Sequence, residues 1–431
     1  MSERQAIINR RENFLTPAHR GMVAYDEPMI LDRGEGTYLF DESGKRYLDC
    51  LGQNLCISLG YNHPVVTEAA VNQLRKLQHC TTMYLNREPG LYAEELIRTF
   101  PDGQESDWVV HLVNSGAEAV ELAFLMARVH TGNHEILSLR NSYHGITPGA
   151  MAATGIGAFR QQTPLDPGFA FLENPDRFKG ILGPETHPYI DHIDRVFATS
   201  TNDRIAGMII EPIQGFGGVV EMPEGYIQAA FEKTRAHGGV CIVDEVQTGF
   251  GRTGSGFWRY ENHNVKPDMI VLGKSIANGF PISAVVVRRE IAESIANHKY
   301  FHTFGSNPVS VAAARATLQV ITEDALIENA HLRGQQFQQG FAELQTQHPI
   351  IGDVRGSGLL AGVEFVKDGD PTKPATEEAK RVHERLRDNG LIIGRGSAAG
   401  NVFRFNPPLT ITNSQVDFVL ELFDKALATV L

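Results

Sequence analysis

The chain has 431 residues, of which 42% are hydrophobic and 21% charged, and its 39 Lys and Arg against 51 Asp and Glu give a net charge of −12. This length predicts two or three domains, or one large α/β core with an appendage. The acidic balance argues against nucleic acid or an anionic membrane as a general partner. No stretch approaches the roughly 20 apolar residues of a membrane-spanning helix, and the N-terminus MSERQAIINRRENF lacks an apolar signal region. We therefore expect a soluble, cytoplasmic protein.

The first third of the chain predicts a hairpin followed by helices. Within residues 37–49, TYLFD and RYLD flank the turn ESGK, whose glycine can accept a positive φ. Apolar residues then recur with a helical period over 64–78 and again near 90–99.

From about residue 108 to 290, short apolar runs alternate with amphipathic helices such as 117–130 and 225–237. Runs that are apolar on both faces and separated by helices are typical of a largely parallel sheet covered on both sides. The runs lie at 108–113, 135–140, 205–211, 239–245, 269–273 and 282–287.

The last third mixes long predicted helices with short strands such as GLLAGVEFV. We expect it to form a smaller α+β domain that packs with the N-terminal segment. The predicted helices are 325–346, 375–389 and 414–430. The predicted units are an N-terminal segment 1–59, a large domain 60–322 and a small domain 323–431.

Polar residues stand directly after the predicted strands, where open α/β sheets bind ligands. After 108–113, a turn containing Gly116 and Ala117 enters a helix, whose first N–H groups suit a phosphate. After 135–140 comes Tyr143, which could stack on a flat ring, although an exposed loop aromatic is the commoner explanation for such a residue taken alone.

Asp244 ends the run 239–245, and Lys274 follows the run 269–273. A buried carboxylate costs free energy unless a cation meets it, and burial lowers the pKa of a lysine and makes its amine nucleophilic. Either residue alone is explained by a solvated charge at the end of a strand. Together with the phosphate turn and the aromatic ring, they supply what pyridoxal phosphate (PLP) requires: an anion site, a ring platform, an acid for the ring nitrogen and an imine-forming lysine.

From about residue 15 to its end, the sequence resembles the class III, or omega-type, aminotransferases, which are fold-type I PLP enzymes. The resemblance implies a mostly parallel seven-stranded sheet flanked by helices, with a smaller α+β domain. It is greatest to the branch of alanine–glyoxylate and beta-alanine–pyruvate aminotransferases, which also contains phosphoethanolamine and aminophosphonate lyases. The matching motifs are NSGAEA at 114–119, SYHG at 142–145, EPIQG at 211–215, DEVQTGFGRTG at 244–254, GKSIANGFP at 273–281, HTFGSNP at 302–308 and RFNPPL at 404–409.

The resemblance implies a cofactor role for each matching residue. Lys274 would hold PLP as a Schiff base and then move the proton between the substrate carbon and the cofactor. Asp244 would pair with the ring nitrogen, and Gln247 would approach the ring hydroxyl. The other implied contacts are Tyr143 and Val246 on the two ring faces, Gly116 and Ala117 at the phosphate, and Thr303 at the phosphate of the neighbouring subunit's cofactor. A homodimer with shared sites, or a higher oligomer, would follow.

The resemblance also indicates which residues would contact the substrate. Arg404 matches the arginine that binds a substrate carboxylate as a planar fork. Glu211 matches a glutamate near the cofactor, for which buried polar support is as good an interpretation as catalysis. In members that use glutamate, the residue after EPIQG is often an acidic gate for the arginine, but here it is Phe216. Arg404 is therefore left without an obvious partner, which favours a small keto acid such as pyruvate or glyoxylate.

Two reactions stay open at this point. The first is transfer of an amino group from a small amine or amino acid, alanine-like or omega-amino, to such a keto acid. The alternative is elimination of ammonia from a phosphoethanolamine-like or hydroxy-aminoethylphosphonate substrate, which begins with the same proton abstraction by Lys274. A lyase would need extra cations or polar groups, and the candidates are Arg20, Arg395, Gln53 and Asn54, each of which also has a surface or structural explanation.

Other classes of function fit less well. The run GRTGSG follows Asp244 by seven residues instead of forming a tight strand–GxGxxG–helix unit, so a nicotinamide dehydrogenase is not indicated. A non-catalytic protein of this fold would be expected to lack Lys274 or Asp244. His144 is interpreted as a structural or hydrogen-bonding residue.

Cysteine and histidine positions predict neither disulfides nor a metal site. The chain contains no CxxC pair, and its 16 histidines include no HExxH pattern. The cysteines are Cys50, Cys56, Cys80 and Cys241.

Overall fold

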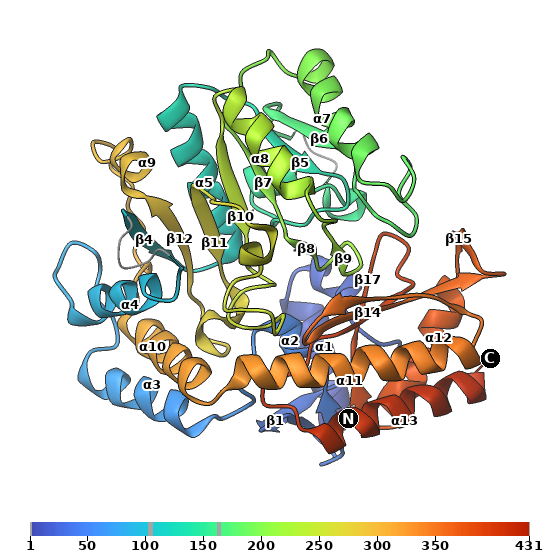
Figure 1. The fold of residues 1–431 in the computed structure, drawn as a ribbon. Coiled ribbons are helices and arrows are strands. Elements are labelled where there is room, and N and C mark those ends of the chain that lie inside the picture. The colour runs from blue at the N-terminus through green and yellow to red at the C-terminus, as the bar shows by residue number, and fades with distance from the viewer. Residues whose placement is uncertain (1, 102–106, 162–164, 431) are drawn as a thin grey trace.

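The computed structural model describes residues 2–101, 107–161 and 165–430. At its centre lies a seven-stranded sheet in the order β4-β12-β11-β10-β7-β5-β6 (Figure 1). β12 is antiparallel to both of its neighbours, and the other adjacent strands of this sheet are parallel. The mostly parallel sheet is thus confirmed. Its strands are β4 (Trp108–Val113), β5 (Ile136–Leu139), β6 (Phe169–Leu172), β7 (Gly207–Ile210), β10 (Val240–Asp244), β11 (Met269–Leu272) and β12 (Ser283–Arg288).

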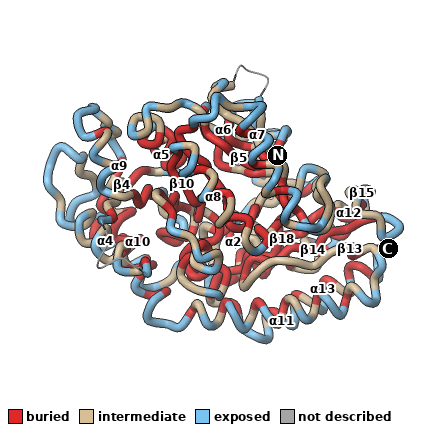
Figure 2. The backbone as a smooth tube through the Cα atoms, turned by 45° about the horizontal axis from the view of Figure 1, so that its top comes forward, coloured by how far each residue is buried: buried red, intermediate tan, exposed pale blue. Residues whose placement is uncertain are grey.

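Helices cover both faces of this sheet, because successive side chains of a strand point to opposite faces. On β10, Ile242 belongs to the same buried cluster as the inner face of α5 (Gly116–Thr131). Its neighbours Cys241 and Val243 instead pack in the cluster that contains α8 (Tyr226–Ala236). Figure 2 shows the strands as buried and the outer helices as largely exposed. Burial on both sides explains why the strands read as unbroken apolar runs.

The remaining helices of this half of the molecule lie around the sheet. α3 and α4 both pack on α10, and α4 also contacts β4. The helices predicted at 64–78, 90–99, 117–130 and 225–237 are confirmed, whereas α7 and α10 were not predicted. The bounds are α3 (Pro64–Lys76), α4 (Arg87–Ile97), α6 (Pro148–Ala153), α7 (His187–Ser200), α9 (Arg289–Glu293) and α10 (Pro308–Glu323).

The two ends of the chain share a second structural layer. The predicted hairpin is formed by β2 and β3, with Gly44 at φ +83° in its turn. β3 pairs in parallel with β16, so an N-terminal and a C-terminal strand complete one sheet in the order β1-β2-β3-β16. This pairing agrees with the expected packing of the two ends, and the boundaries at residues 59 and 322 stay predictions. The bounds are β1 (Leu31–Glu35), β2 (Tyr38–Asp41), β3 (Arg46–Asp49) and β16 (Leu391–Ile392).

A second C-terminal sheet has the antiparallel order β13-β14-β18-β17, and β15 also pairs with β14. α11 and α13 lie side by side along it (Figure 1), and their inner faces contribute to a core of closely packed phenylalanine rings. All three helices predicted here are confirmed. The bounds are β13 (Ile351–Ser357), β14 (Leu360–Lys367), β15 (Asp370–Pro374), β17 (Gly394–Gly396), β18 (Val402–Phe405), α11 (Leu326–Gln347), α12 (Thr376–Asp388) and α13 (Asn413–Val430).

Short elements complete the fold. They are α1 (Glu3–Phe14), the left-handed turn α2 (Gly52–Leu55), the two-stranded β8 (Ile213–Gln214) and β9 (Val220–Glu221), and 3₁₀ turns at Pro17–Gly21, Gly157–Phe159, Arg259–His263 and Lys274–Ala277. The four cysteines are free thiols. Within the described ranges, no helix is long and apolar enough to cross a membrane, and no group of three His, Cys, Asp or Glu side chains could hold a metal ion.

Candidate active site

A cavity of about 270 Å³ lies at the carboxyl ends of β4, β5, β7, β10 and β11. This is where an open α/β sheet offers its loops and helix N-termini to a ligand. The cavity gathers every predicted site residue except Thr303, Arg20, Arg395 and Gln53. Its lining residues are Asn54, Gly116, Ala117, Tyr143, His144, Gly145, Ile146, Glu211, Phe216, Asp244, Val246, Gln247, Lys274 and Arg404.

The N-terminus of α5 offers two free backbone donors to this cavity. Ser115 caps the helix and accepts from the N–H of Glu118 (3.3 Å), while the Glu118 carboxylate accepts from the N–H groups of Asn114 (2.7 Å) and Ser115 (3.1 Å). This capping box leaves the N–H groups of Gly116 and Ala117 without an acceptor in the described chain. Two adjacent unpaired donors at the positive end of a 16-residue helix form a site for an anion.

Asp244 is held by a buried histidine. The Nδ1–H of His144 donates to Asp244 Oδ2 (2.7 Å), and the N–H of Val246 donates to Oδ1 (3.0 Å). The side chains of His144 and Asp244 are almost completely buried. The hydrogen-bonding interpretation of His144 is confirmed, and its Nε2 has no partner among the described residues. A carboxylate fixed on two donors is pre-oriented for a further cationic N–H.

Lys274 stands directly beyond the buried strand β11, in a strained backbone conformation. Its φ is +43°, in the left-handed region that side chains other than Gly, Asn and Asp rarely adopt. The turn is tied to the N-terminal segment, since Ser275 Oγ donates to the carbonyl of Leu55 (3.1 Å) and Ser58 Oγ donates to that of Ser275 (3.0 Å). Burial lowers the pKa of the Lys274 amine, against the opposing charge of Asp244. The expected effect of burial on this lysine is therefore confirmed in direction.

Glu211 supports the loops around the cavity. Its carboxylate accepts from the N–H of Tyr143 (2.9 Å) and the N–H of Gly215 (3.3 Å). Burial raises the pKa of Glu211 to about 7. These two backbone bonds favour the structural interpretation over a direct catalytic one.

Tyr143 belongs to a cluster of three aromatic rings at the cavity wall. Its ring centroid lies 4.9 Å from that of Phe159 and 5.2 Å from that of Phe216. Phe159 and Phe216 meet edge to face at 4.9 Å. Sequence reasoning missed Phe159, because nothing in the local pattern around it indicates a site.

Arg404 does have partners, contrary to the sequence expectation. Its NH2 group donates to Gln247 Oε1 (3.0 Å), and its guanidinium carbon lies 5.1 Å from the centre of the Phe216 ring. The side chain is buried, its Nε has no partner among the described residues, and burial lowers its pKa to about 10. The expectation failed because it considered acidic partners only, whereas an amide oxygen and an aromatic face hold this arginine.

The other candidate cations lie outside the cavity. β17 pairs with β18 so that Gly394 stands opposite Arg404 and Arg395 opposite Phe403. Because side chains alternate along a strand, Arg395 points to the face opposite that of Arg404. Arg20 is exposed, in the 3₁₀ turn after α1, and donates to the carbonyl of Glu12 (3.4 Å).

Thr303 is also exposed and away from the cavity of its own chain.

Asn54 reaches the cavity from a rare backbone conformation. Gly52, Gln53, Asn54 and Leu55 all have positive φ, between 48° and 70°, and form one left-handed turn. Runs of this kind cost free energy in L-residues and persist where the surrounding structure enforces them. Asn54 is thus brought to the site, whereas Gln53 is not among the lining residues.

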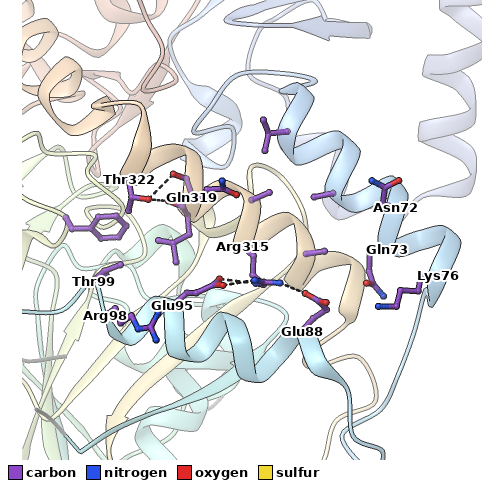
Figure 3. A pocket seen from close by; sticks show the side chains of 16 residues that line it. Asn72, Gln73, Lys76, Glu88, Glu95, Arg98, Thr99, Arg315, Gln319 and Thr322 are labelled. Carbon is purple, nitrogen blue, oxygen red and sulfur yellow. Dashed lines mark hydrogen bonds and ion pairs between the residues drawn. The ribbon is translucent and has the colours of Figure 1, made fainter. Parts of the chain in front are cut away.

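A larger cavity, of about 740 Å³, lies between α3, α4 and α10 (Figure 3). Its most polar feature is Arg315, which donates to Glu88 (2.6 Å) and to both carboxylate oxygens of Glu95 (2.9 and 2.6 Å). The guanidinium of Arg315 is thus fully engaged by two carboxylates, and this cavity is lined by neither a buried lysine nor a free helix N-terminus. The smaller cavity is therefore the candidate active site.

Comparisons with known proteins agree with this geometry. The family model described as Aminotransferase class-III matches residues 22–427. The chain belongs to the class III aminotransferases. Over 422 residues it is 40% identical to the mitochondrial alanine–glyoxylate aminotransferase 2 homolog 2 of Arabidopsis thaliana, which covers 98% of this chain and 87% of that protein.

Two solved structures show the range of this class III fold. A phospholyase from Arthrobacter in complex with phosphoethanolamine is 32% identical, with a TM-score of 0.89, and the match covers 99% of this chain and 100% of that one. A PLP-bound amine transaminase from an uncultivated Pseudomonas species is 28% identical, with a TM-score of 0.88 and coverage of 96% and 97%.

As a class III aminotransferase the protein is a PLP-dependent enzyme, and the residues of the cavity fit that cofactor. The free N–H groups of Gly116 and Ala117 suit its phosphate. The anchored carboxylate of Asp244 suits a protonated ring nitrogen, and the amine of Lys274 suits its aldehyde. The roles of these individual residues stay predictions.

Proposed function

We propose that this class III aminotransferase transfers an amino group from a small amine or amino acid, alanine-like or omega-amino, to a keto acid such as pyruvate or glyoxylate. The observation that carries the proposal is the buried guanidinium of Arg404, which shares a 270 Å³ cavity with Lys274 and faces Phe216 instead of an acidic gate. The similarity to an alanine–glyoxylate aminotransferase 2 homologue supports it.

PLP, when bound, withdraws electrons from the amino-bearing carbon of the substrate and so acidifies its C–H bond. The lowered pKa of Lys274 raises the neutral fraction of its amine, and a neutral amine can attack a carbonyl and accept a proton at Nζ. Asp244, fixed by His144, keeps a cationic ring nitrogen paired. These residues bind, orient and transfer the proton within a partly enclosed cavity.

Arg404 would orient the substrate through its carboxylate. A guanidinium offers two parallel N–H donors that match a carboxylate, and here Nε is buried and without a partner among the described residues. Gln247 holds one terminal nitrogen of Arg404 and keeps its own NH2 group as a donor. Because Phe216 cannot form an ion pair with Arg404, the arginine stays ready for a small monocarboxylate.

Elimination is the second candidate, because a phospholyase shares this fold at 32% identity. A phosphate or phosphonate leaving group would require several cations around it. The lysine and arginine side chains that line the cavity within the described chain are Lys274 and Arg404, while Arg20 and Arg395 lie elsewhere. This distribution of charge favours transamination.

The test is ammonia release from beta-alanine, phosphoethanolamine and aminophosphonates by the holoenzyme, with no keto acid present. We expect no sustained ammonia, but one conversion of the bound cofactor to its amine form, followed by its recovery on addition of pyruvate or glyoxylate. Steady ammonia production without an acceptor would overturn the proposal in favour of elimination. Lys274→Ala serves as the inactive control.

The proposed assembly is a homodimer in which Thr303 reaches the partner's site. Large apolar side chains are exposed in the segments 78–85 and 301–307. The two segments lie together, because Asn307 donates to the carbonyl of Gln78 (3.0 Å) and His79 packs on Phe304. The exposed residues include Met83, Tyr84, Leu85, Phe301 and Phe304. Exposed apolar patches of this kind mark protein interfaces.

Co-expression tests the shared site. If Thr303 acts across the interface, a dimer of one Lys274→Ala chain and one Thr303→Lys chain contains one intact site. Random pairing of two inactive variants should then restore about a quarter of the wild-type sites. Activity no higher than that of the separate variants would contradict shared sites.

The cytoplasmic location also stays a proposal. It rests on the four cysteines, which are free thiols and fit a reducing compartment. Cell fractionation with an antibody to the native chain is the test.

A further inference from the structure

The loop 215–219, called here the Phe216 loop, has a strained backbone and is held by hydrogen bonds from residues outside the loop. Val219 has a φ of +59°, which is a true outlier for a β-branched residue. The loop turns tightly, with the N–H groups of Gly218 and Val219 both donating to the carbonyl of Gly215 (3.3 and 3.2 Å). A strained conformation of this kind persists only where neighbouring contacts impose it.

Two contacts from the C-terminal part of the chain supply that constraint. The Nε–H of Arg355, on β13, donates to the carbonyl of Gly218 (2.8 Å). The N–H of Ser397, just after β17, donates to the carbonyl of Phe216 (3.0 Å). The loop is therefore held at the carbonyls of Phe216 and Gly218, by one backbone donor and one side-chain donor from the C-terminal part of the chain.

The two donors, Arg355 and Ser397, are both connected through hydrogen bonds to one buried carboxylate, that of Glu364 on β14. Glu364 accepts from Arg355 NH2 (2.6 Å), from the Nζ of Lys179 and from the amide of Asn401 (3.2 Å). The side-chain oxygen of Asn401 in turn accepts from Ser397 Oγ (2.8 Å). Arg355 is paired a second time, with Asp353 (2.6 Å).

The charges of this cluster are well satisfied despite their burial. The side chain of Glu364 is 1% exposed and that of Arg355 12%. Burial by itself would raise the pKa of Glu364, but Arg355 and Lys179 outweigh it and hold that pKa below its usual value. A buried ion cluster in which each member has partners is rigid, and breaking one link leaves the others uncompensated.

We propose that Arg355, held by Glu364, is a positioning residue that fixes the Phe216 ring and thereby the guanidinium of Arg404. Arg355 is absent from the lining of the cavity, so it acts through the loop. Phe216 lies 5.1 Å from the Arg404 guanidinium and 5.2 Å from the Tyr143 ring, so a displaced loop moves the aromatic wall against which Arg404 rests. This inference rests on the proposed role of Arg404 in binding a carboxylate.

The test measures binding of propanoate to the holoenzyme by isothermal titration calorimetry. Arg355→Lys keeps the charge next to Glu364 but lacks the planar fork that also reaches Gly218. We expect propanoate affinity to fall about fivefold, the effect of one hydrogen bond. In transamination, KM for pyruvate should rise by a similar factor with kcat within about twofold.

A double-mutant cycle separates this role from general support. In a Phe216→Leu background, Arg355→Lys should change propanoate affinity by less than about twofold, because the ring through which it acts is gone. Equal effects in the two backgrounds would overturn the proposal. Ser397→Gly, which tolerates the positive φ of that residue (+70°) and removes the bond to Asn401, should repeat the pattern if Arg355→Lys folds poorly.

Two further variants complete the design. Arg387 on α12 is a matched control, since it is 15% exposed, pairs with Glu384 (3.1 Å) and Asp388 (2.7 Å), and donates to a main-chain carbonyl outside the loop. Arg387→Lys should leave propanoate affinity unchanged. Arg404→Gln tests the proposed function itself. Unchanged binding in Arg404→Gln would refute that function, whereas weakened binding there with unchanged binding in Arg355→Lys would refute only the positioning role.

Discussion

The bond between His144 and Asp244 gives the sharpest prediction for catalysis. His144→Phe keeps a flat ring in the pocket and removes the 2.7 Å hydrogen bond to Asp244 Oδ2. The Nε2 of His144 has no partner among the described residues, so no other protein bond to the ring is lost. The variant therefore isolates the contact that holds the carboxylate.

The expected magnitude follows from the burial of this pair. A hydrogen bond to a charged group contributes about 1.5–3 kcal/mol, and 1.36 kcal/mol corresponds to tenfold in rate, so kcat should fall by about 10- to 150-fold. KM should change little, because His144 contacts Asp244 and is not hydrogen-bonded to Arg404, the proposed substrate-binding residue. The assay is single-turnover conversion of the bound cofactor by beta-alanine, followed by absorbance.

A second buried histidine provides the matched control. His383 is 3% exposed, stacks on Tyr25 at 4.5 Å and has one ring nitrogen bonded to the carbonyl of Ile393 (3.0 Å). His383→Phe should lower thermal stability and leave kcat unchanged. If His144→Phe kept kcat within about twofold of the wild type while Asp244→Asn lost activity, the assigned role of His144 would be refuted.

Three further predictions concern the same site and its supports. Lys274→Ala should abolish transamination and elimination alike, and retained turnover in either assay would refute the mechanism. Gly215→Ala places a Cβ 2.3 Å from Gln247 Oε1, so Gln247 must release Arg404 and KM for pyruvate should rise about tenfold; Gly90→Ala, where nothing lies within 4 Å, should behave as wild type. Because the folded pKa of Glu364 lies below its ordinary 4.5, its contribution to the free energy of unfolding is present above about pH 4.5 and is lost as the pH falls. Denaturant titrations give the free energy of unfolding at pH 7 and at pH 4. The loss of this free energy between pH 7 and pH 4 should be smaller for Glu364→Gln than for the wild type, and an equal loss would argue against the charge of Glu364 as a source of stability.

Most of the secondary structure could be predicted from the sequence, because its signals are local. Six strands of the large sheet were predicted from their apolar runs, and the C-terminal helices were placed to within about two residues. β6 (Phe169–Leu172) was missed because it is a four-residue edge strand and only one of its residues is fully buried. α10 was missed although Asn307 caps it and Pro308 begins it, which are ordinary start signals.

The candidate site also has residues that the sequence predicts and contacts that only the structure decides. Lys274, Asp244 and the turn at Gly116 stand next to strong strand signals, and the motifs around them carry the resemblance to the family. The resemblance singled out Arg404 for the substrate carboxylate, but the sequence left Arg395 open as a further cation at the site. Only the register of β17 against β18 decides that one enters the cavity and the other points away.

The sequence by itself therefore determined the fold class, the family and the chemical groups at the ends of the strands, since periodicity and motif spacing are properties of the chain. The tertiary structure decided which of those groups meet. His144 contacts Asp244 across 100 residues, and Arg404 contacts Gln247 across 157. Hydrogen bonds are short and directional, and the ring contacts of Arg404 and Phe216 depend on packing to within an ångström or so. Such positions are fixed only once distant segments have packed, so no local pattern can specify them.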